Sequence, residues 1–444
     1  MTENNTICAL ASGSPPAAIA IIRVSGPATN LICEQMLTET LLPARMATRC
    51  VFRDMSGNII DDCLAIRFAA PNSYSGEDGL EIYVHGGPAI IEHALSALTD
   101  RPDVRMAEPG EFTRRAFENG KLDLIQAEGV ADLIEAETRN QKSQALRQLD
   151  GLLSKTYEDW RERLIQILAL IEVSIDFPDE DDAPEDTRAP VIARLNDLIA
   201  EFDRALSDKG IGERIREGFR VAIIGAPNAG KSTLLNRLAK REAAIVTSIP
   251  GTTRDVVEVR LRLAGQIVWV ADTAGLRETA DEIEAEGIRR ARQAADVADI
   301  RIFLSAIDDE QAANIAPDYR EATDIHVVNK VDQRVGVPEH PDAIKISALT
   351  GMGVDALEAQ LTENISALVN TSEAPVITRM RHRTRLEAAR SDLLKAIDNL
   401  QNYDRAEFAG EDVRLAVRQI GAIVGHIDVE DVLSSVFSDF CIGK

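Results

Sequence analysis

One eight-residue loop near the middle of the chain constrains the fold more than any other feature. Residues 225–232 read GAPNAGKS, the complete P-loop pattern. The apolar run 219–224 before the loop predicts a strand, and the run 233–238 after it predicts a helix. In this context, backbone N–H groups and a helix N-terminus point at phosphate oxygens. We therefore predict a nucleotide site whose phosphate-contacting residues are Asn228, Ala229, Gly230, Lys231, Ser232 and Thr233.

Two side chains of this loop have separate predicted roles. Lys231 is expected to bridge the terminal phosphates, and the Ser232 hydroxyl is expected to hold Mg²⁺. A P-loop alone indicates only a nucleoside triphosphatase, because the loop reads phosphates and not the base.

The base is indicated by a second motif, NKVD, at residues 329–332. A carboxylate at Asp332 accepts from the two N–H donors of guanine, whereas adenine would leave it unpaired at a cost of several kcal/mol, about 2 to 3. The tripeptide SAL at 347–349 is placed where a backbone N–H meets the guanine carbonyl. The predicted base-contacting residues are Asn329, Lys330, Val331, Asp332, Ser347, Ala348 and Leu349. Together the motifs predict a GTPase domain.

The expected switch segments follow the P-loop at suitable intervals. One threonine of GTTRD, residues 251–255, is expected to complete the Mg²⁺ shell. The DTAG motif ends the expected strand 267–271 and comprises Asp272, Thr273, Ala274 and Gly275. Ras-like switches continue with a glutamine that positions water, but here the next residue is Leu276. Either hydrolysis is slow, or another residue, such as an acid of 277–284, performs this role; a solvated acidic loop is the alternative interpretation.

Composition limits the possible classes of protein. With 444 residues the chain is expected to form two or three domains, and no apolar run is long enough to span a bilayer. The N-terminus is acidic where a targeting peptide would be basic, and the five cysteines are unclustered, which together favour a reducing, cytoplasmic setting. A net charge of −24 argues against a general nucleic-acid coat, so any RNA contact should be local or made by a partner.

The texture of the sequence changes along the chain. Residues 1–118 hold short β-like runs between Gly/Pro loops and predict an α+β domain. Helical periodicity covers 119–217, interrupted by an acidic loop at 176–186, and it resumes over 375–444, with a last helix from 411 to the end. Residues 218–374 alternate strand and helix. The predicted architecture is a multidomain α/β and α protein with a Ras-like GTPase domain inserted into a split helical domain.

Several motifs together resemble one family. They are the P-loop, EAAIVT at 242–247, GTTRD at 251–255, DTAGLRE at 272–278 and the terminal FCIGK at 440–444. With these motifs the chain resembles the MnmE (TrmE) family of tRNA modification GTPases over essentially its whole length, including 72–87 and 109–123. Many families share a P-loop, but a P-loop GTPase that ends in Cys-Ile-Gly-Lys is specific.

The resemblance implies how this GTPase works. In the family, GTPase domains dimerise across their nucleotide faces when K⁺ is bound, and K⁺ replaces an arginine finger. Ser232 and Thr253 match the Mg²⁺ ligands, and Glu284 matches the acid that positions water. The K⁺ ligands match Asn228 in the P-loop and three residues of the loop 247–252, namely Thr247, Ile249 and Thr252. This whole loop matches nucleotide-contacting positions: Thr247, Ser248, Ile249, Pro250, Gly251 and Thr252.

The resemblance also implies a second site, in the first domain. The family's first domain resembles folate-binding aminomethyltransferases, dimerises and binds a tetrahydrofolate derivative, either 5-formyl or 5,10-methylene. Arg23, Glu81 and Lys121 match folate-contacting positions, and Lys444 reaches the same pocket. Cys441 lies near that pocket in the family; it is either a nucleophile in catalysis or a support for the site, and a buried inert thiol is the alternative.

The expected function follows from both sites. With a FAD-dependent partner (MnmG in the family), in a heterotetramer, the homodimer would add an aminomethyl or carboxymethylaminomethyl group to C5 of the wobble uridine of tRNA, away from membranes. The alternatives are a ribosome-assembly GTPase and a purely regulatory switch. The basic cluster 379–385 is either a tRNA contact or a solvated face, and His85 contacts a ligand or satisfies a turn.

Overall fold

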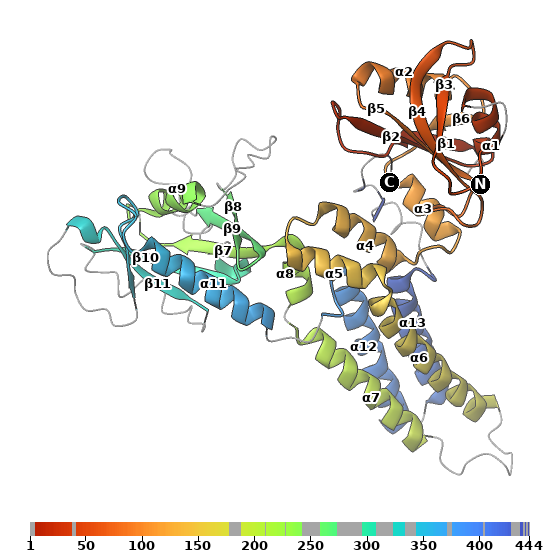
Figure 1. Cartoon of the computed structure of the whole chain (residues 1–444). Helices are drawn as coiled ribbons and strands as arrows, with labels where there is room; N and C mark the ends of the chain where they lie inside the picture. Colours follow the sequence, from red (N-terminus) through yellow and green to blue (C-terminus); the bar gives the residue numbers. More distant parts are fainter. Residues whose placement is uncertain are drawn as a thin grey trace, which may run out of the picture. The chain divides into compact units, whose positions relative to one another are not determined.

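The computed structural model divides into two compact units, each described here by itself (Figure 1). Unit 1 comprises Met1–Ile134, Leu146–Ile199 and Ala388–Lys444, and unit 2 comprises Glu135–Ala145 and Ala200–Glu387. The predicted domain boundaries at 118, 217 and 374 remain predictions. The structure describes residues 5–37, 41–176, 188–208, 210–226, 228–241, 258–272, 295–307, 323–333, 343–370, 375–402, 405–427, 436–437, 440 and 443.

The first domain, in unit 1, contains a six-stranded sheet in the order β3-β4-β5-β2-β1-β6. Neighbouring strands are antiparallel except for the parallel pair β1–β6. The strands are β1 (Thr6–Leu10), β2 (Ile19–Ser25), β3 (Thr48–Arg53), β4 (Ile59–Phe68), β5 (Gly79–His85) and β6 (Val104–Met106). Strands and helices are mixed in this domain, as the α+β prediction required.

Helices cover the two faces of this sheet unequally. On one face α1 (Thr29–Ile32), η1 (Cys33–Leu37) and α2 (Pro88–Thr99) pack onto alternate strand residues and form the main core. On the other face α3 (Glu111–Glu118) covers only the β1 side, where Phe112 packs with Ile7 and Ala9. The rest of that face carries Arg23, Glu81 and their neighbours.

Long helices make up much of the rest of unit 1, and some of them include residues assigned to unit 2. They are α4 (Leu124–Glu135), α5 (Arg139–Leu149), α6 (Leu152–Asp176), α7 (Arg188–Leu206), α12 (Met380–Asn402) and α13 (Ala406–Val424). Residues far apart in sequence pair here, because α13 packs along α6 in unit 1 (Figure 1). The predicted acidic loop between α6 and α7 falls mostly on 177–187, outside the described residues.

The last predicted helix is corrected at both ends. It begins at Ala406, five residues earlier than expected, and it stops at Val424 instead of running to the end of the chain. Gly425 has φ of 101°, the left-handed conformation that ends helices, and a turn follows it. A Cβ at Gly425 would lie 2.8 Å from the ring of Phe117, so packing as well as backbone conformation requires glycine here.

Unit 2 contains the predicted nucleotide-binding sheet, in the order β12-β11-β10-β7-β9-β8. All neighbours are parallel except the antiparallel edge pair β8–β9. The strands are β7 (Phe219–Ile224), β8 (Glu258–Leu263), β9 (Gln266–Asp272), β10 (Ile300–Ala306), β11 (Ile325–Asn329) and β12 (Ile344–Lys345). Since β7, β9 and β11 are parallel, their carboxyl ends gather the P-loop, Asp272 and Asn329 at one edge.

Two helices cover one face of this sheet. Residues of α9 (Lys231–Arg241) and α11 (Val354–Asn370) join alternate strand residues in a single buried cluster that includes Val221, Ile302 and Leu361. The short elements α8 (Ile211–Glu217) and η3 (Val331–Gln333) complete the described part of this unit.

The segments before β7 and after α11 are joined within unit 2. The Arg383 guanidinium donates to Glu213 Oε1 at 2.8 Å and to Asp208 Oδ1 at 2.7 Å. The hydrogen bond to Glu213, despite burial, raises the pKa of Arg383, so its charge is fixed. A Cβ at Gly212 would overlap the carbonyl oxygen of Ile377, which shows how closely the two segments pass.

Two further properties concern the described residues as a whole. None of their helices has the length and apolar character needed to cross a membrane. The cysteines Cys8, Cys33, Cys50 and Cys63 are buried free thiols. Cys441 lies outside the described residues.

Candidate functional site

The P-loop is seated between β7 and α9 by tight backbone packing. A Cβ at Gly225 would overlap the carbonyl oxygen of Leu304 on β10, so the loop can only leave the sheet here with glycine. Asn228 has φ of 66°, in the left-handed region. Lys231 Nζ donates to the carbonyl oxygens of Gly225 at 2.7 Å and Ala226 at 3.0 Å. The ammonium group is thus held over the loop that it was predicted to serve.

Asn329 joins the P-loop to the loop 347–349. Its Nδ2 donates to Ala229 O at 2.8 Å, and its Oδ1 accepts from the backbone N–H of Ala348 at 2.9 Å. The side chain is only 2% exposed, so both bonds are shielded from water. A Cβ at Gly230 would overlap the Asn329 amide nitrogen, so the close approach depends on glycine. The structure therefore brings the phosphate motif and both base motifs together.

The NKVD and SAL segments have well-defined backbones. Lys330 has φ of 63°, and Val331 N donates to Ile346 O at 3.3 Å, which places η3 beside the loop. Ser347 N donates to Met352 O at 2.8 Å and so closes the loop. The Asp332 side chain is exposed next to it. The Asp332 carboxylate can accept from the N–H donors of a base, and a backbone N–H of the loop can donate to the carbonyl acceptor of the same base.

Many predicted switch residues fall on parts of the chain that the structure does not describe. Asp272 is the last residue of β9, and Ser232 is exposed in the first turn of α9. Thr233 follows it, also exposed. Outside the described residues are Thr247, Ser248, Ile249, Pro250, Gly251, Thr252, Thr253, Thr273, Ala274, Gly275 and Glu284.

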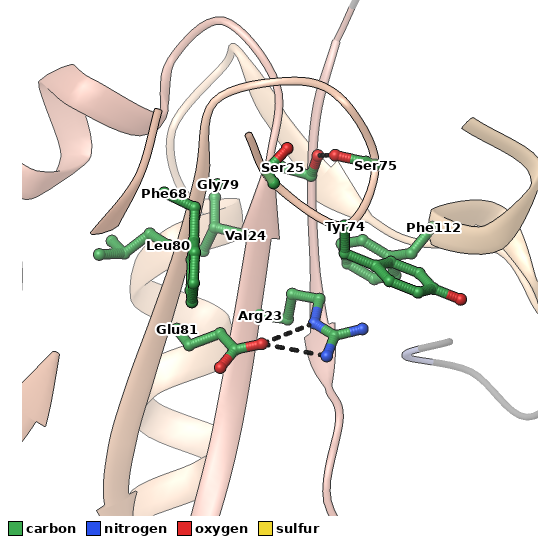
Figure 2. A pocket seen from close by; sticks show the side chains of 11 residues that line it. Arg23, Val24, Ser25, Phe68, Tyr74, Ser75, Gly79, Leu80, Glu81 and Phe112 are labelled. Atoms are coloured by element: carbon green, nitrogen blue, oxygen red, sulfur yellow. Dashed lines mark hydrogen bonds and ion pairs between the residues drawn. The ribbon is translucent and has the colours of Figure 1, made fainter. Parts of the chain in front are cut away.

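A second candidate site is a cavity of about 220 Å³ on the partly open face of the first domain's sheet (Figure 2). Arg23 on β2 lies directly opposite Glu81 on β5, and Arg23 Nε and Nη2 donate to Glu81 Oε1 at 3.2 and 3.0 Å. The Tyr83 hydroxyl donates to Glu81 Oε2 at 2.8 Å. The lining residues are Arg23, Val24, Ser25, Phe68, Ser73, Tyr74, Ser75, Gly79, Leu80, Glu81 and Phe112.

Two aromatic rings lie close to the Arg23 guanidinium in this cavity (Figure 2). Its carbon lies 5.1 Å from the Tyr74 ring centroid and 5.7 Å from that of Phe112. Burial raises the pKa of Tyr74, and its hydroxyl is hydrogen-bonded to Thr113 Oγ1 at 2.8 Å. Flat walls with a cation and a carboxylate suit a planar ligand that has a polar edge. Sequence reasoning missed both rings, and neither has a local pattern that distinguishes it from core aromatics.

Of the other residues predicted for this site, the described part of the chain includes Lys121 alone. Lys121 is not a lining residue; its Nζ donates to Pro71 O at 3.0 Å, which fixes the loop that carries Tyr74. Gly443 packs against β1, since a Cβ there would overlap the carbonyl oxygen of Leu10. Leu10 is paired with Ile22, the neighbour of Arg23. Cys441 and Lys444, on either side of Gly443, are outside the described residues.

The weaker candidates from the sequence are His85 and the basic cluster 379–385, and both make contacts within the fold. His85 is hydrogen-bonded through Nδ1 to Asp61 Oδ1 at 2.9 Å and is not among the lining residues of the cavity around Arg23. In the basic cluster 379–385, His382 is fully buried and Arg383 is held by two carboxylates. His382 and Arg383 are therefore engaged within the fold. A tRNA contact and a solvated face both stay predictions for the partly exposed Arg379, Arg381 and Arg385.

The fold and the meeting of these loops define a P-loop GTPase. Models of the MnmE helical domain and of the GTP-binding protein TrmE N-terminus match residues 124–441 and 6–121. The chain belongs to the family of the tRNA modification GTPase MnmE, whose GTPases bind GTP and Mg²⁺.

Curated relatives carry the same name over their full length. The tRNA modification GTPase MnmE of Hyphomonas neptunium is 58% identical over 444 residues, covering 100% of both chains. Those of Parvibaculum lavamentivorans and Maricaulis maris are 49% and 47% identical, and each alignment covers 99% of this chain and 100% of the relative. The similarity therefore includes the first domain and the helical segments as well as the GTPase domain.

Proposed function

We propose that this protein is a K⁺-stimulated GTPase that, with a FAD-dependent partner, adds an aminomethyl or carboxymethylaminomethyl group to C5 of the wobble uridine of certain tRNAs. The observation that carries the proposal is the presence of two distinct sites in a single chain of this family. One is the guanine-nucleotide site joined by Asn329, and the other is the cavity around Arg23 and Glu81.

The nucleotide site is suited to hydrolysis controlled by cations. Ser232 is exposed in the first turn of α9, and its hydroxyl suits Mg²⁺. Asn228 has an amide oxygen, a suitable ligand for K⁺. With Thr253 as second Mg²⁺ ligand and Thr247, Ile249 and Thr252 at K⁺, the cations would supply positive charge near the phosphates. Glu284 would position the attacking water, a role that Leu276 cannot perform.

The cavity of the first domain fits a tetrahydrofolate derivative by its chemistry. The Glu81 carboxylate can accept from the donor edge of a pterin, and Tyr74 and Phe112 offer flat apolar surface. Arg23 holds the Glu81 carboxylate in place at 3.0 Å, whereas Lys121 and Lys444, which match folate-contacting positions, suit the carboxylates of a glutamate tail. The cofactor would supply the one-carbon unit. Cys441 would act on the uridine or support the site.

Assembly is supported by the uncovered part of the first domain's sheet. On the face that carries Arg23, Ile19 is 60% exposed and Leu64 is 48% exposed, and Tyr83 lies between their strands. Exposed apolar residues on one face of a sheet favour a protein contact. We propose that this face forms the homodimer, and that the FAD-dependent partner and tRNA join it in a heterotetramer.

The test is mass spectrometry of nucleosides from bulk tRNA in cells with and without this protein. We expect C5-aminomethyl-type uridines to disappear without it and to return with the wild type, but not with Glu284→Ala. If the uridines are unchanged while ribosomal subunits accumulate, the chain is a GTPase of ribosome assembly and the proposed pathway is wrong.

A further inference from the structure

Arg237 lies in the second turn of α9 and bonds to the loop that follows β12. Its Nε donates to Ala348 O at 3.0 Å, and its Nη2 donates to Leu349 O. The two partners are more than a hundred residues away in sequence but belong to the predicted guanine loop. The P-loop pattern ends at Ser232, so the sequence motifs predict no role for Arg237.

The two halves of the loop 347–349 are held in different ways. Ser347 and Ala348 are buried, and the Ala348 N–H is bonded to Asn329. Leu349, by contrast, has a side chain that is 68% exposed, so packing of that side chain does not anchor the loop there. The Arg237 guanidinium supplies the anchor, since its planar fork bonds two successive carbonyl groups at once.

Orientation of these peptide groups decides what the loop offers to a base. Each carbonyl that Arg237 holds belongs to a peptide plane that also carries the next N–H group, and fixing one end of the plane fixes the other. The plane of the Ala348 carbonyl carries the Leu349 N–H, so the guanidinium fixes where that N–H points. The Thr350 N–H, in the plane of the Leu349 carbonyl, is bonded to Ser347 Oγ at 3.1 Å. Gly351 Cα lies beside it, since a Cβ at Gly351 would come within 3.5 Å of Arg237 Nη1.

We infer that Arg237 is a positioning residue for guanine specificity. By holding the carbonyl groups of Ala348 and Leu349, it presents the Leu349 N–H to the O6 acceptor of guanine, because the Ala348 and Thr350 N–H groups are bonded within the protein. This inference rests on the proposed guanine-nucleotide site and adds to it a residue that acts through the loop without touching the base.

Calorimetry with three diphosphates on the full-length chain tests it. GDP and inosine diphosphate carry O6, whereas 2-aminopurine riboside diphosphate lacks it. In Arg237→Ala we expect about tenfold weaker binding of GDP and of inosine diphosphate, comparable to one lost hydrogen bond. Binding of the 2-aminopurine compound should change by less than about twofold, because its base has no O6 for the loop to recognise.

Two variants and one stability measurement serve as controls. Arg237→Lys keeps the charge but not the fork, so an intermediate loss for GDP, about threefold, is expected. Lys240→Ala removes an exposed cation from the same helix and should leave all three affinities unchanged. Thermal unfolding reports whether each variant is folded; if Arg237→Ala is not, Arg237→Lys decides between the outcomes.

Equal losses for all three ligands, or no loss for GDP, would overturn the inference, since Arg237 would then be structural or inert. A wild-type chain that does not prefer GDP to the 2-aminopurine compound would instead contradict the proposed guanine site itself. The two failures are therefore distinguishable.

Discussion

At the residue scale, the carboxylate at position 332 can only accept hydrogen bonds, and this limits the bases that it can recognise. Asp332→Asn replaces one acceptor oxygen by a donor, which suits the second carbonyl of xanthine and opposes the amino group of guanine. We expect GDP affinity to fall on the order of 100-fold, with xanthosine diphosphate becoming the preferred ligand. Calorimetry with both diphosphates measures this.

The same substitution should not affect folding, because the Asp332 side chain is exposed. An unchanged unfolding temperature is thus the control. If Asp332→Asn binds GDP as tightly as the wild type, Asp332 does not contact the base.

Glu81 is the corresponding residue in the first domain. Glu81→Gln keeps its size but removes the negative charge that pairs with Arg23 and that would accept from a pterin. We expect about tenfold weaker binding of 5-formyltetrahydrofolate, since hydrogen bonds to charged groups contribute more than neutral ones. Tyr83→Phe deletes the hydroxyl that donates to Glu81 but leaves the carboxylate, and should bind within about threefold of the wild type. Equal binding by Glu81→Gln would exclude Glu81 from the site.

At the scale of elements, the start of α3 depends on a buried carboxylate, Glu111. Burial alone would raise its pKa, but hydrogen bonds from Arg105, from the Glu108 backbone N–H and from Arg115 outweigh this effect and lower the pKa to about 2 from 4.5. A lowered folded-state pKa means stability that is fully present above pH 4.5 and is lost as the pH falls through 2. The difference corresponds to about 3 kcal/mol at neutral pH.

Hydrogen exchange of the α3 amides measures this contribution. Glu111→Gln should lower their protection at pH 7, and the difference from the wild type, compared at equal pH, should shrink to a few tenths of a kcal/mol near pH 2, where about half of the Glu111 carboxyl groups are protonated in the folded state. A difference that stays constant from pH 7 to pH 2 would show that the charge of Glu111 does not stabilise α3.

Elements of this chain differ in how far their sequence determines them. The strand, loop and helix around the P-loop could be predicted, because an apolar run, glycines and a helix start are local signals. The end of α13 could not, since helical periodicity continues in the sequence beyond Gly425, and the stop there is accompanied by close packing against Phe117. Local pattern identified the elements, and tertiary packing set their limits.

At the scale of the whole molecule, distance along the chain limited what could be predicted of the sites. Residues 329–332 and 347–349 could be assigned to a base site because their spacing from the P-loop follows a known pattern. Tyr74 and Phe112, whose ring centroids lie 5.1 and 5.7 Å from the Arg23 guanidinium carbon, belong to no such pattern, and only the folded domain brings them together. The anchoring of Leu349 by Arg237 is likewise a contact that no motif encodes.

Within unit 1, Gly443 near the C-terminus packs against β1 of the first domain. Its φ is 98°, and a Cβ there would overlap the carbonyl oxygen of Leu10, so Gly443→Ala must displace the chain end from this strand. If Cys441 and Lys444 serve the cavity beside β2, we expect uridine modification in cells to fall about tenfold or more, comparable to the loss of a positioned catalytic group. GDP affinity should be unchanged, since the nucleotide site belongs to unit 2.

Gly57 provides a matched control for backbone strain. Its φ of 87° is also left-handed, but a Cβ there would meet no atom within 4 Å. Gly57→Ala therefore introduces the same kind of strain without a clash, and modification should remain near the wild-type level. Equal losses in both variants would mean that destabilisation of the first domain, and not displacement of the C-terminal residues, causes the defect. Full modification in Gly443→Ala would show that the chain end need not be held against β1, and Cys441 and Lys444 would lose their structural link to the cavity.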